Sequence, residues 1–488
     1  MEVSVANFGP LTSARIRLQP LTVFVGPNNS GKSYLAMLLY SLYQAYSGEA
    51  AFGLRSLRDG PGGFSVSMAK RVLQWAHSED QEFVDSHGDA LLTWLDQVSG
   101  DDPGVNRLRI GDLPAFLQMP MRELVRSACL DFADSTHAAV QRSFGAKMAA
   151  LIGWANPSSQ VSVRLHHDAP AWSLDMQLGD GEVRAQMAEE AIADLIIPFT
   201  LPVALPPRRG RPNPQAKAWK ELRWSAEQAL LIECFREFQR SVLYLPADRG
   251  GYLQASRAIA SGMVQQSLIF RSPPGDGSLL PGVVSDFISM MISLPYAHVG
   301  ELANVAASIE RDILSGDLAV TPSDHAFPDI AYRSRGVSIP MHRSSSMVSE
   351  LAPVLLLLRH GIAPGDMLII EEPEAHLHPA NQRKFALGIA RMVRAGLRVL
   401  LSTHSDYFLA ELSNGVRRSE LDEAGGAFLR PQEVGAYLFN LDATTGTSYV
   451  QELPISAVDG IPEDGFVQAA DELYEETAYL QTANALSR

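Results

Sequence analysis

The segment from Gly26 to Ser33 constrains this chain more than any other part of its sequence. It reads Gly-Pro-Asn-Asn-Ser-Gly-Lys-Ser and follows an apolar run, Leu21 to Val25. This is the phosphate-loop pattern G-x-x-x-x-G-K-[ST], in the place between a strand and a helix that its mechanism requires. Its glycines let backbone N–H groups close around phosphates, and the start of the helix adds a partial positive charge. The segment therefore predicts a site for the phosphates of a nucleotide.

The residue types in this loop predict how it would hold the nucleotide. Lys32 is expected to reach the β- and γ-phosphates, and Ser33 is expected to offer its hydroxyl to Mg²⁺. The residues expected to contact the nucleotide are Gly26, Pro27, Asn28, Asn29, Ser30, Gly31, Lys32, Ser33 and Tyr34.

A second acidic element follows the apolar strand predicted at Met367 to Ile370, where Glu371, Glu372 and Pro373 come next. Successive strand residues point to opposite sides. We therefore expect Glu371 to belong to the Mg²⁺ shell and Glu372 to polarise the attacking water. Two glutamates after a strand are usually just a solvated strand end, and the phosphate loop is what favours the catalytic interpretation.

The chain changes character along its length. Strands alternate with helices in residues 1–46 and again in 241–460, which predicts an α/β fold with a mostly parallel sheet. Residues 47–240 form helical segments broken by Gly, Pro and Asp clusters, with an antiparallel β unit between residues 160 and 186. This part is expected to be a large, mainly helical insertion, and residues 461–488 a C-terminal amphipathic helix.

Composition limits the partners. The 488 residues include 40 Lys and Arg against 55 Asp and Glu, for a net charge of −15. Bulk electrostatics would therefore repel nucleic acid and anionic membrane, so a DNA contact would need a local patch. No signal peptide or long apolar span is present, and we expect a cytoplasmic protein without a membrane partner. Cys129 and Cys234 are too far apart to indicate zinc or a disulfide framework, and both are expected in the core.

Three further features resemble the ABC-type ATPase superfamily, in the branch of SMC-like, RecF-like and overcoming-lysogenisation-defect (OLD) proteins. Glu371 to Pro379 reads E-E-P-E-A-H-L-H-P and resembles that branch's Walker B and D-loop. Thr403-His404-Ser405 resembles the switch segment, whose histidine contacts the γ-phosphate. Ser344 to Glu350 opens a helix at the place of the ABC signature. The resemblance covers residues 1–46 and 241–460 and implies an ATPase head.

The resemblance also implies a partner, because in this family the signature reaches across a dimer of two heads. Ser345 and Ser346 are the residues that would face the γ-phosphate of a second copy, although a serine N-cap is the ordinary alternative. Leu245 to Arg249 stands where the family has its Q-loop but lacks glutamine, so Asp248 and Arg249 are weak candidates there.

Other activities are weighed against this interpretation. No D-x-D pair follows His404, so we expect no TOPRIM nuclease here and assign cleavage to a separate partner. Glu374, His376, His378 and His404 could instead form a metal cluster, an alternative to the D-loop and switch. Arg208-Arg209-Gly210-Arg211-Pro212 contains the R-G-R-P core of minor-groove hooks and is the best local candidate for DNA contact.

The sequence thus favours an ATPase whose dimer closes on ATP and reopens on hydrolysis. It resembles the stand-alone ATPases of bacterial antiphage systems, which control a separately encoded effector such as a nuclease. A RecF-like or SMC-like DNA repair ATPase that binds DNA directly is one alternative. An assembly scaffold that binds ATP with little turnover is another.

Overall fold

The computed structural model describes most of the chain, apart from several intervening segments. The described residues are 1–47, 79–99, 106–154, 156, 160–168, 171–199, 214–255, 280–321, 328–420, 428–462 and 474–480.

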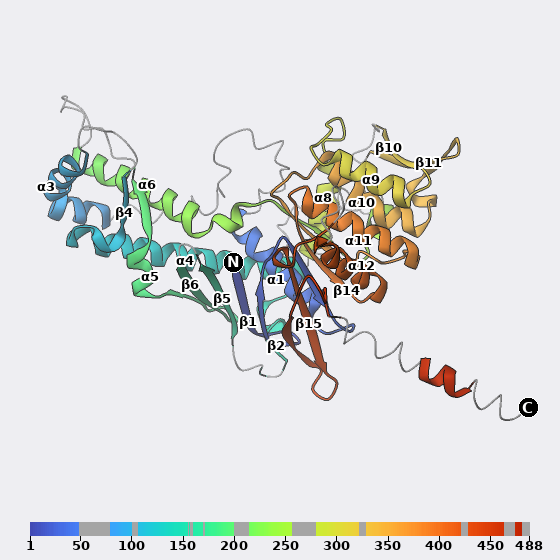
Figure 1. The fold of residues 1–488 in the computed structure, drawn as a ribbon. Helices are drawn as coiled ribbons and strands as arrows, with labels where there is room; N and C mark the ends of the chain where they lie inside the picture. The colour runs from blue at the N-terminus through green and yellow to red at the C-terminus, as the bar shows by residue number, and fades with distance from the viewer. Residues whose placement is uncertain are drawn as a thin grey trace, which may run out of the picture.

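A large mixed sheet forms the centre of the molecule (Figure 1). Within the described ranges it has eleven strands, in the order β7-β6-β5-β1-β2-β16-β15-β3-β14-β13-β9. One end is parallel and comprises β9 (Val242–Leu245), β13 (Met367–Glu371), β14 (Arg398–Thr403), β3 (Leu21–Val25) and β15 (Val434–Asp442). The other end is antiparallel and comprises β2 (Leu11–Arg17), β1 (Glu2–Phe8), β5 (Val161–Asp168), β6 (Ala171–Leu178) and β7 (Val183–Met187). β16 (Thr447–Leu453) joins the two ends, antiparallel to β15 and parallel to β2.

Burial differs between the two ends of the sheet, as their sequences require. Every residue of β3 and β13 is buried, which fits parallel strands covered on both faces. Residues of β6 alternate between buried and less buried positions, which fits an antiparallel strand with one face against the core. The mixed α/β fold class expected from the sequence is therefore confirmed.

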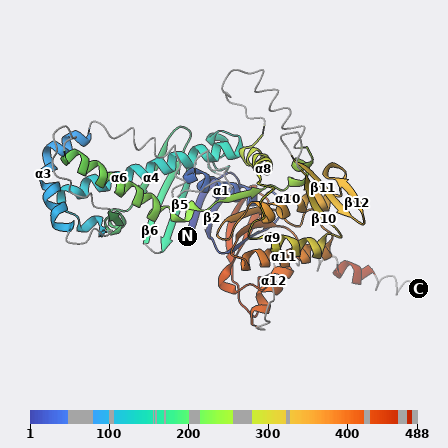
Figure 2. The same ribbon diagram turned by 90° about the horizontal axis from the view of Figure 1, so that it is seen from above.

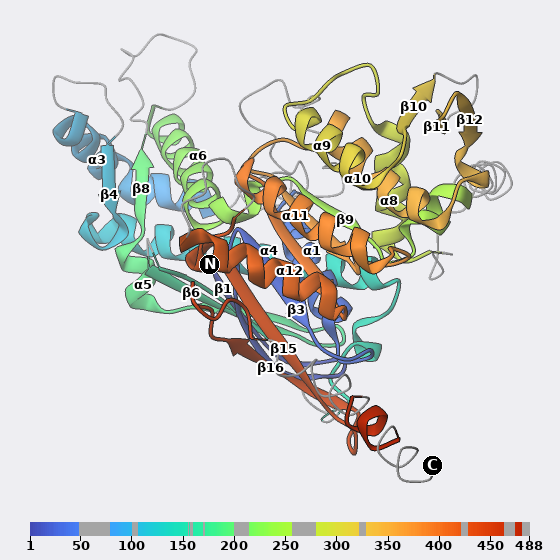
Figure 3. The same cartoon turned by 45° about the vertical axis from the view of Figure 1, so that its right-hand side comes forward.

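Helices cover both faces of the parallel strands. α1 (Lys32–Ser47) begins the connection from β3 toward β9, whereas α11 (Pro379–Arg394) leads from β13 back to β14, and α12 (Asp406–Arg417) from β14 to β15. The connection that begins with α1 crosses the sheet in the opposite direction to the connections through α11 and α12, and right-handed crossovers then place α1 on one face and α11 and α12 on the other. Figure 3 shows α11 and α12 in front of the sheet and α1 behind it.

Two further groups of elements flank the sheet (Figures 1 and 2). The first, which we call the arm, extends away from the sheet and comprises α3 (Glu79–Ser99), β4 (Asn106–Arg109), α4 (Ala115–Phe144), β8 (Ile196–Phe199) and α6 (Pro214–Cys234), with the short α5 (Glu189–Asp194) beside it. The second lies on the opposite side and comprises α8 (Gly282–Ser293), α9 (Ala303–Ile313), α10 (Ser346–His360) and a small sheet of β10 (Asp317–Thr321), β11 (Asp329–Ser334) and β12 (Val337–Pro340).

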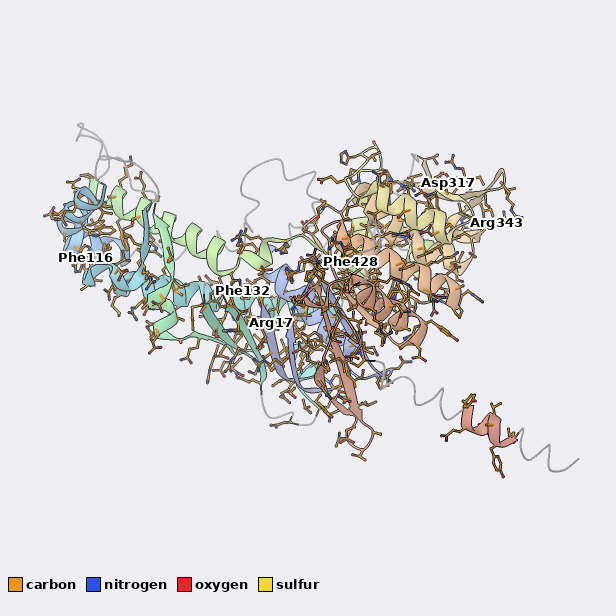
Figure 4. All side chains as sticks on the ribbon, in the orientation of Figure 1. Arg17, Phe116, Phe132, Asp317, Arg343 and Phe428 are labelled. Carbon is orange, nitrogen blue, oxygen red and sulfur yellow. The ribbon has the colours of Figure 1, made fainter. Side chains whose placement is uncertain are left out.

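The long helix α4 joins the arm to the sheet through its C-terminal half. Phe132, labelled in Figure 4, stacks on Phe235 with ring centroids 4.6 Å apart, in a cluster that also contains Phe238 and Tyr43 of α1. Near the end of α4, the hydroxyl of Ser41 on α1 donates to that of Ser143 over 2.9 Å. α4 is thereby packed directly against the helix that begins in the phosphate loop.

A buried charge joins three helices at the same place. Asp286 of α8 accepts hydrogen bonds from both terminal nitrogens of Arg142, one of them at 2.9 Å, and from Tyr40 of α1 at 2.8 Å. Burial raises the pKa of Asp286, and Arg142 and Tyr40 oppose that shift.

Several sequence expectations can be compared with these elements. β11 and β12 form a hairpin around Ser334 to Gly336, and both Arg335 and Gly336 have positive φ, as a tight turn requires. The antiparallel unit between residues 160 and 186 forms, and its first strand pairs with β1. The sequence did not predict β15, β16 or α12. Within the described ranges, no helix combines the length and the apolar character needed to cross a bilayer.

Other expectations have mixed outcomes. Cys129 is buried in α4, and burial raises the pKa of its thiol to about 12. The side chain of Cys234 and the basic run from Arg208 to Pro212 lie outside the described residues. Of the predicted C-terminal helix, residues 474–480 are helical with exposed side chains, and the flanking residues are not described.

Replacement of Asp286 tests the charge that joins the three helices. We expect Asp286→Asn to lower the free energy of unfolding by about 2 kcal/mol, because Arg142 loses its buried carboxylate. Asp317→Asn is the matched control, since Asp317 pairs with Arg333 in a solvent-exposed ion pair at the edge of the molecule (Figure 4) and should cost less than about 0.5 kcal/mol. Urea denaturation measures both; equal losses would contradict the assignment.

Candidate nucleotide-binding site

The phosphate loop between β3 and α1 depends on its two glycines. Gly26 has φ of 147°, and a Cβ there would lie 2.7 Å from the carbonyl oxygen of Phe439. Gly31 has φ of 91°, and a Cβ there would lie 2.7 Å from a methyl carbon of Leu11. Both positions therefore exclude a side chain, for conformational and steric reasons. Their spacing is what gives the loop its shape.

Lys32 lies inside this loop and is only 6% exposed. Its ammonium donates to the carbonyl oxygens of Gly26 at 2.8 Å and Pro27 at 2.7 Å. Burial lowers its pKa, and the carboxylates of Glu372, Glu374 and Glu371 oppose that shift. The cation is thus already held where the loop would receive phosphate groups.

Glu371 ends β13 with a buried carboxylate. Its Oε2 accepts from the backbone N–H of Ala247 over 3.3 Å, while its Oε1 is buried and accepts no hydrogen bond from any described residue. Burial raises the pKa of Glu371, and the nearby hydroxyls of Ser33 and Tyr244 oppose the shift. A carboxylate oxygen with spare capacity beside a serine hydroxyl is a donor set that suits Mg²⁺. Ser33 and Glu371 are therefore the residues that would hold the ion.

Glu372 follows in an unusual backbone conformation, with φ of 43°. Its N–H donates to the carbonyl oxygen of Ser402 at the end of β14 over 3.0 Å. Its carboxylate is one-third exposed and lies 3.6 Å from Nδ1 of His404. The structure therefore brings Glu372 and His404 together.

Glu374 holds the segment that carries His404, a role that the sequence did not predict. Its buried Oε1 accepts from the hydroxyl of Thr403 at 2.7 Å and from the backbone N–H of His404 at 2.9 Å. Glu374 is the third acid of the E-E-P-E motif, and that motif was the sequence signal from which its role could have been predicted.

The alternative metal cluster is not formed. Among the described residues no group of three or more His, Cys, Asp or Glu side chains is placed to hold a metal ion. His378 instead caps α11 by accepting from the N–H of Ala380.

The serines at the start of α10 are exposed. Ser345 is the N-cap, and its hydroxyl accepts from the N–H of Val348 over 3.5 Å. Ser346 begins the helix, and both side chains face solvent. The ordinary capping role is therefore present for Ser345, and the helix terminus is also open to a ligand.

Tyr34 and Arg249 lie in positions that the sequence motifs did not suggest. The ring of Tyr34 packs edge-to-face against Phe8 at 5.7 Å, and a Cβ at Gly9 would collide with it. Arg249, a weak Q-loop candidate, has its side chain fully buried, whereas the neighbouring Asp248 is exposed.

Two regions of the chain match known protein families. Residues 1–86 match a family described as an AAA ATPase domain. Residues 300–410 match a family described as an AAA domain, putative AbiEii toxin, type IV TA system. The first region contains Lys32, and the second contains the paired glutamates and His404. Both matches support an ATPase of the AAA type.

Solved structures align over nearly the whole chain but with low scores. An SMC head bound to the C-terminal winged-helix domain of ScpA aligns with a TM-score of 0.36 and 11% identity, covering 93% of this chain and 97% of its own. The SMC head domain from Thermotoga maritima gives 0.36 and 10%, covering 93% and 98%. The Pyrococcus furiosus Smc head with an extended coiled coil, bound to the C-terminal domain of ScpA, gives 0.36 and 9%, covering 98% of both chains. No curated protein sequence matches the chain.

Removal of the loop cation tests the site. Lys32→Ala should weaken ATP binding by about 1.5–3 kcal/mol, or roughly 10- to 150-fold in Kd, because charge-assisted hydrogen bonds to phosphate are lost. Lys384→Ala is the matched control, since its ammonium donates to a backbone carbonyl on the surface. Calorimetric titration with Mg-ATP measures both, and unchanged binding in Lys32→Ala would rule the loop out as the phosphate site.

Proposed function

We propose that this protein binds Mg-ATP in the loop from Gly26 to Ser33 and hydrolyses it. One observation carries the proposal: Lys32, Glu371, Glu372 and His404 gather where the parallel strands β3, β13 and β14 end. In open α/β sheets, ligands bind in the crevice outside these strand ends. The matches to two AAA-type ATPase families support the same activity.

Each residue of the site has a separate role in the proposed hydrolysis. Glu372 orients a water for attack on the γ-phosphorus and accepts its proton, since its carboxylate is accessible and lies at the open end of β13. Lys32 stabilises the negative charge that develops on the γ-phosphate and on the departing ADP oxygen. Bound Mg²⁺ would neutralise phosphate charge from its place at Ser33 and Glu371. His404 contacts the γ-phosphate. Through this contact the switch segment, which Glu374 holds, responds to whether the γ-phosphate is present.

The site is completed, in this proposal, by a second copy of the chain. The exposed N-terminus of α10, with Ser345 and Ser346, presents backbone N–H groups and two hydroxyls to solvent. Such a terminus attracts anions. The γ-phosphate bound to one copy is the anion that it would meet in a head-to-head dimer.

The biological role proposed for this ATPase is signalling to a separate effector. ATP binding and hydrolysis would close and reopen the dimer and so signal to another protein. We propose an ATPase subunit of a bacterial antiphage system that controls an effector such as a nuclease. One of the two matched families is described as an AAA domain, putative AbiEii toxin, type IV TA system. Co-purification from the native operon tests the partner and its stoichiometry together.

Replacement of the general base tests hydrolysis. Glu372→Gln should lower kcat for ATP by about 100- to 10,000-fold, because the amide cannot accept the proton. ATP affinity should stay within about threefold, since the phosphate contacts remain. Glu433→Gln is the control, because its carboxylate pairs with Arg394 on the surface. Phosphate release measures kcat, and nucleotide titration measures the affinity for ATP. Wild-type turnover in Glu372→Gln would show that Glu372 is not the general base.

The composite site has its own test. With ATP, the Glu372→Gln variant should accumulate as a dimer, because it cannot hydrolyse the ATP that holds the dimer closed. Adding Ser346→Glu should prevent dimerisation, since a carboxylate repels the γ-phosphate. Ser338→Glu, at an exposed position of β12, is the control for added charge. Light scattering gives the mass of each; a dimer that survives Ser346→Glu would contradict the proposed interface.

A further inference from the structure

Among the residues that the structure describes, Arg249 is the largest side chain that is fully buried, and the sequence offered it only as a weak Q-loop candidate. We propose that Arg249 and Glu350 are positioning residues that couple the start of α10 to the catalytic end of β13. Through them, contact at the α10 terminus sets the backbone that carries Glu371 and Glu372. The proposal rests on the ATPase function proposed above and adds a route of communication to it.

The guanidinium of Arg249 binds three separate elements at once. Its Nη1 donates to the carbonyl oxygen of Glu371 over 2.8 Å, and its Nη2 lies 3.4 Å from that of Glu372. Its Nε donates to the carbonyl oxygen of Glu350 over 3.0 Å. Nη1 also reaches the carbonyl of Pro246, 3.4 Å away, on its own segment. The planar, multi-donor geometry of arginine is what allows one side chain to do this.

Glu350, on α10, makes the contacts that connect this helix to Arg249 and Gly250. Its Oε2 lies 3.3 Å from Nε of Arg249, and its Oε1 accepts from the N–H of Gly250 over 3.2 Å. The contact is tight, because a Cβ at Gly250 would lie 2.5 Å from Oε1. The carboxylate of Glu350 therefore lies directly against the backbone that follows β9.

These contacts lie next to the groups that would react. Glu372 has a left-handed backbone with φ of 43°, which costs energy in a residue with a side chain. Its N–H is fixed by Ser402 and its carbonyl by Arg249. The direction of the catalytic carboxylate therefore depends on the guanidinium.

The other end of the connection faces solvent. Ser346 and Glu350 are one helical turn apart on α10, so a shift of the exposed terminus moves Glu350 with it. A second copy that docks on Ser345 and Ser346 would act on the Glu372 backbone through a continuous series of contacts. One end of the series is the Glu372 backbone in the site of this copy, the other is the exposed terminus of α10, and Arg249 and Glu350 between them are buried.

A contribution to stability does not by itself explain a buried ion pair of this kind. Removing two charges from water is costly, and apolar side chains of similar volume often serve the fold as well or better. Burial lowers the pKa of Arg249 and raises that of Glu350, and each charge opposes the shift of the other. Positioning of the strand end is the role that accounts for the pair.

Kinetics of the dimerising protein test the coupling. Glu350→Gln should lower kcat for ATP by about tenfold or more while Kd for Mg-ATP stays within about twofold, since no phosphate contact is removed. Because one buried charge is then left uncompensated, the double variant Arg249→Met, Glu350→Leu is measured as well. It replaces the pair with apolar groups, should fold, and should show the same loss of kcat.

The matched control is another ion pair on the same helix. Arg359, near the C-terminal end of α10, pairs with Glu310 of α9 over 2.6 Å and touches none of the site residues. Glu310→Gln should leave kcat near the wild-type value. Thermal unfolding of all variants separates loss of structure from loss of positioning.

The outcomes are distinct. A selective loss of kcat in Glu350→Gln and in the folded double variant supports the coupling. Wild-type kcat in either one, or an equal loss in Glu310→Gln, overturns it while leaving the ATPase intact. An absence of turnover in the wild-type protein would overturn the proposed function, and the coupling with it.

Discussion

Three parallel strands that end side by side determine where the reactive groups of this protein lie. β14 is hydrogen-bonded to β3 on one side and to β13 on the other. The phosphate loop, the paired glutamates and His404 therefore open at one edge of the sheet. β3 and β13 are buried along their whole length, so hydrophobic packing fixes their position. The polar residues at their ends take their spacing from that core.

Several charges beneath this edge are kept out of water. Lys32 is held by loop carbonyls, and Glu371 by one backbone N–H, with the hydroxyls of Ser33 and Tyr244 nearby. Arg249 is held by the carbonyls of the very residues that it orients. Such groups are expensive for the fold to bury. Their concentration beside Glu372, away from the ordinary surface ion pairs, fits a site organised for phosphate chemistry.

Much of this site could be predicted from the sequence, because its signals are local. A glycine-rich loop between a strand and a helix, and two acids after a strand, each lie within a few residues. The role of Arg249 could not be predicted, since its partner Glu350 lies 101 positions further along the chain. β15 was missed for a similar reason: its parallel neighbour is β3, from the opposite end of the chain. Nothing in the local pattern of either strand specifies that pairing.

The root of the arm is fixed to the phosphate-loop helix by Arg142, Asp286 and Tyr40. α4 has 30 residues and is therefore about 45 Å long. Arg142 lies near the C-terminal end of α4, and the rest of the helix extends from there toward the arm. A rotation of about 5° at the root would displace its far end by about 4 Å, given that length. A small movement of α1 that leaves the core intact would thus give a larger displacement at the N-terminal end of α4, far from the nucleotide site.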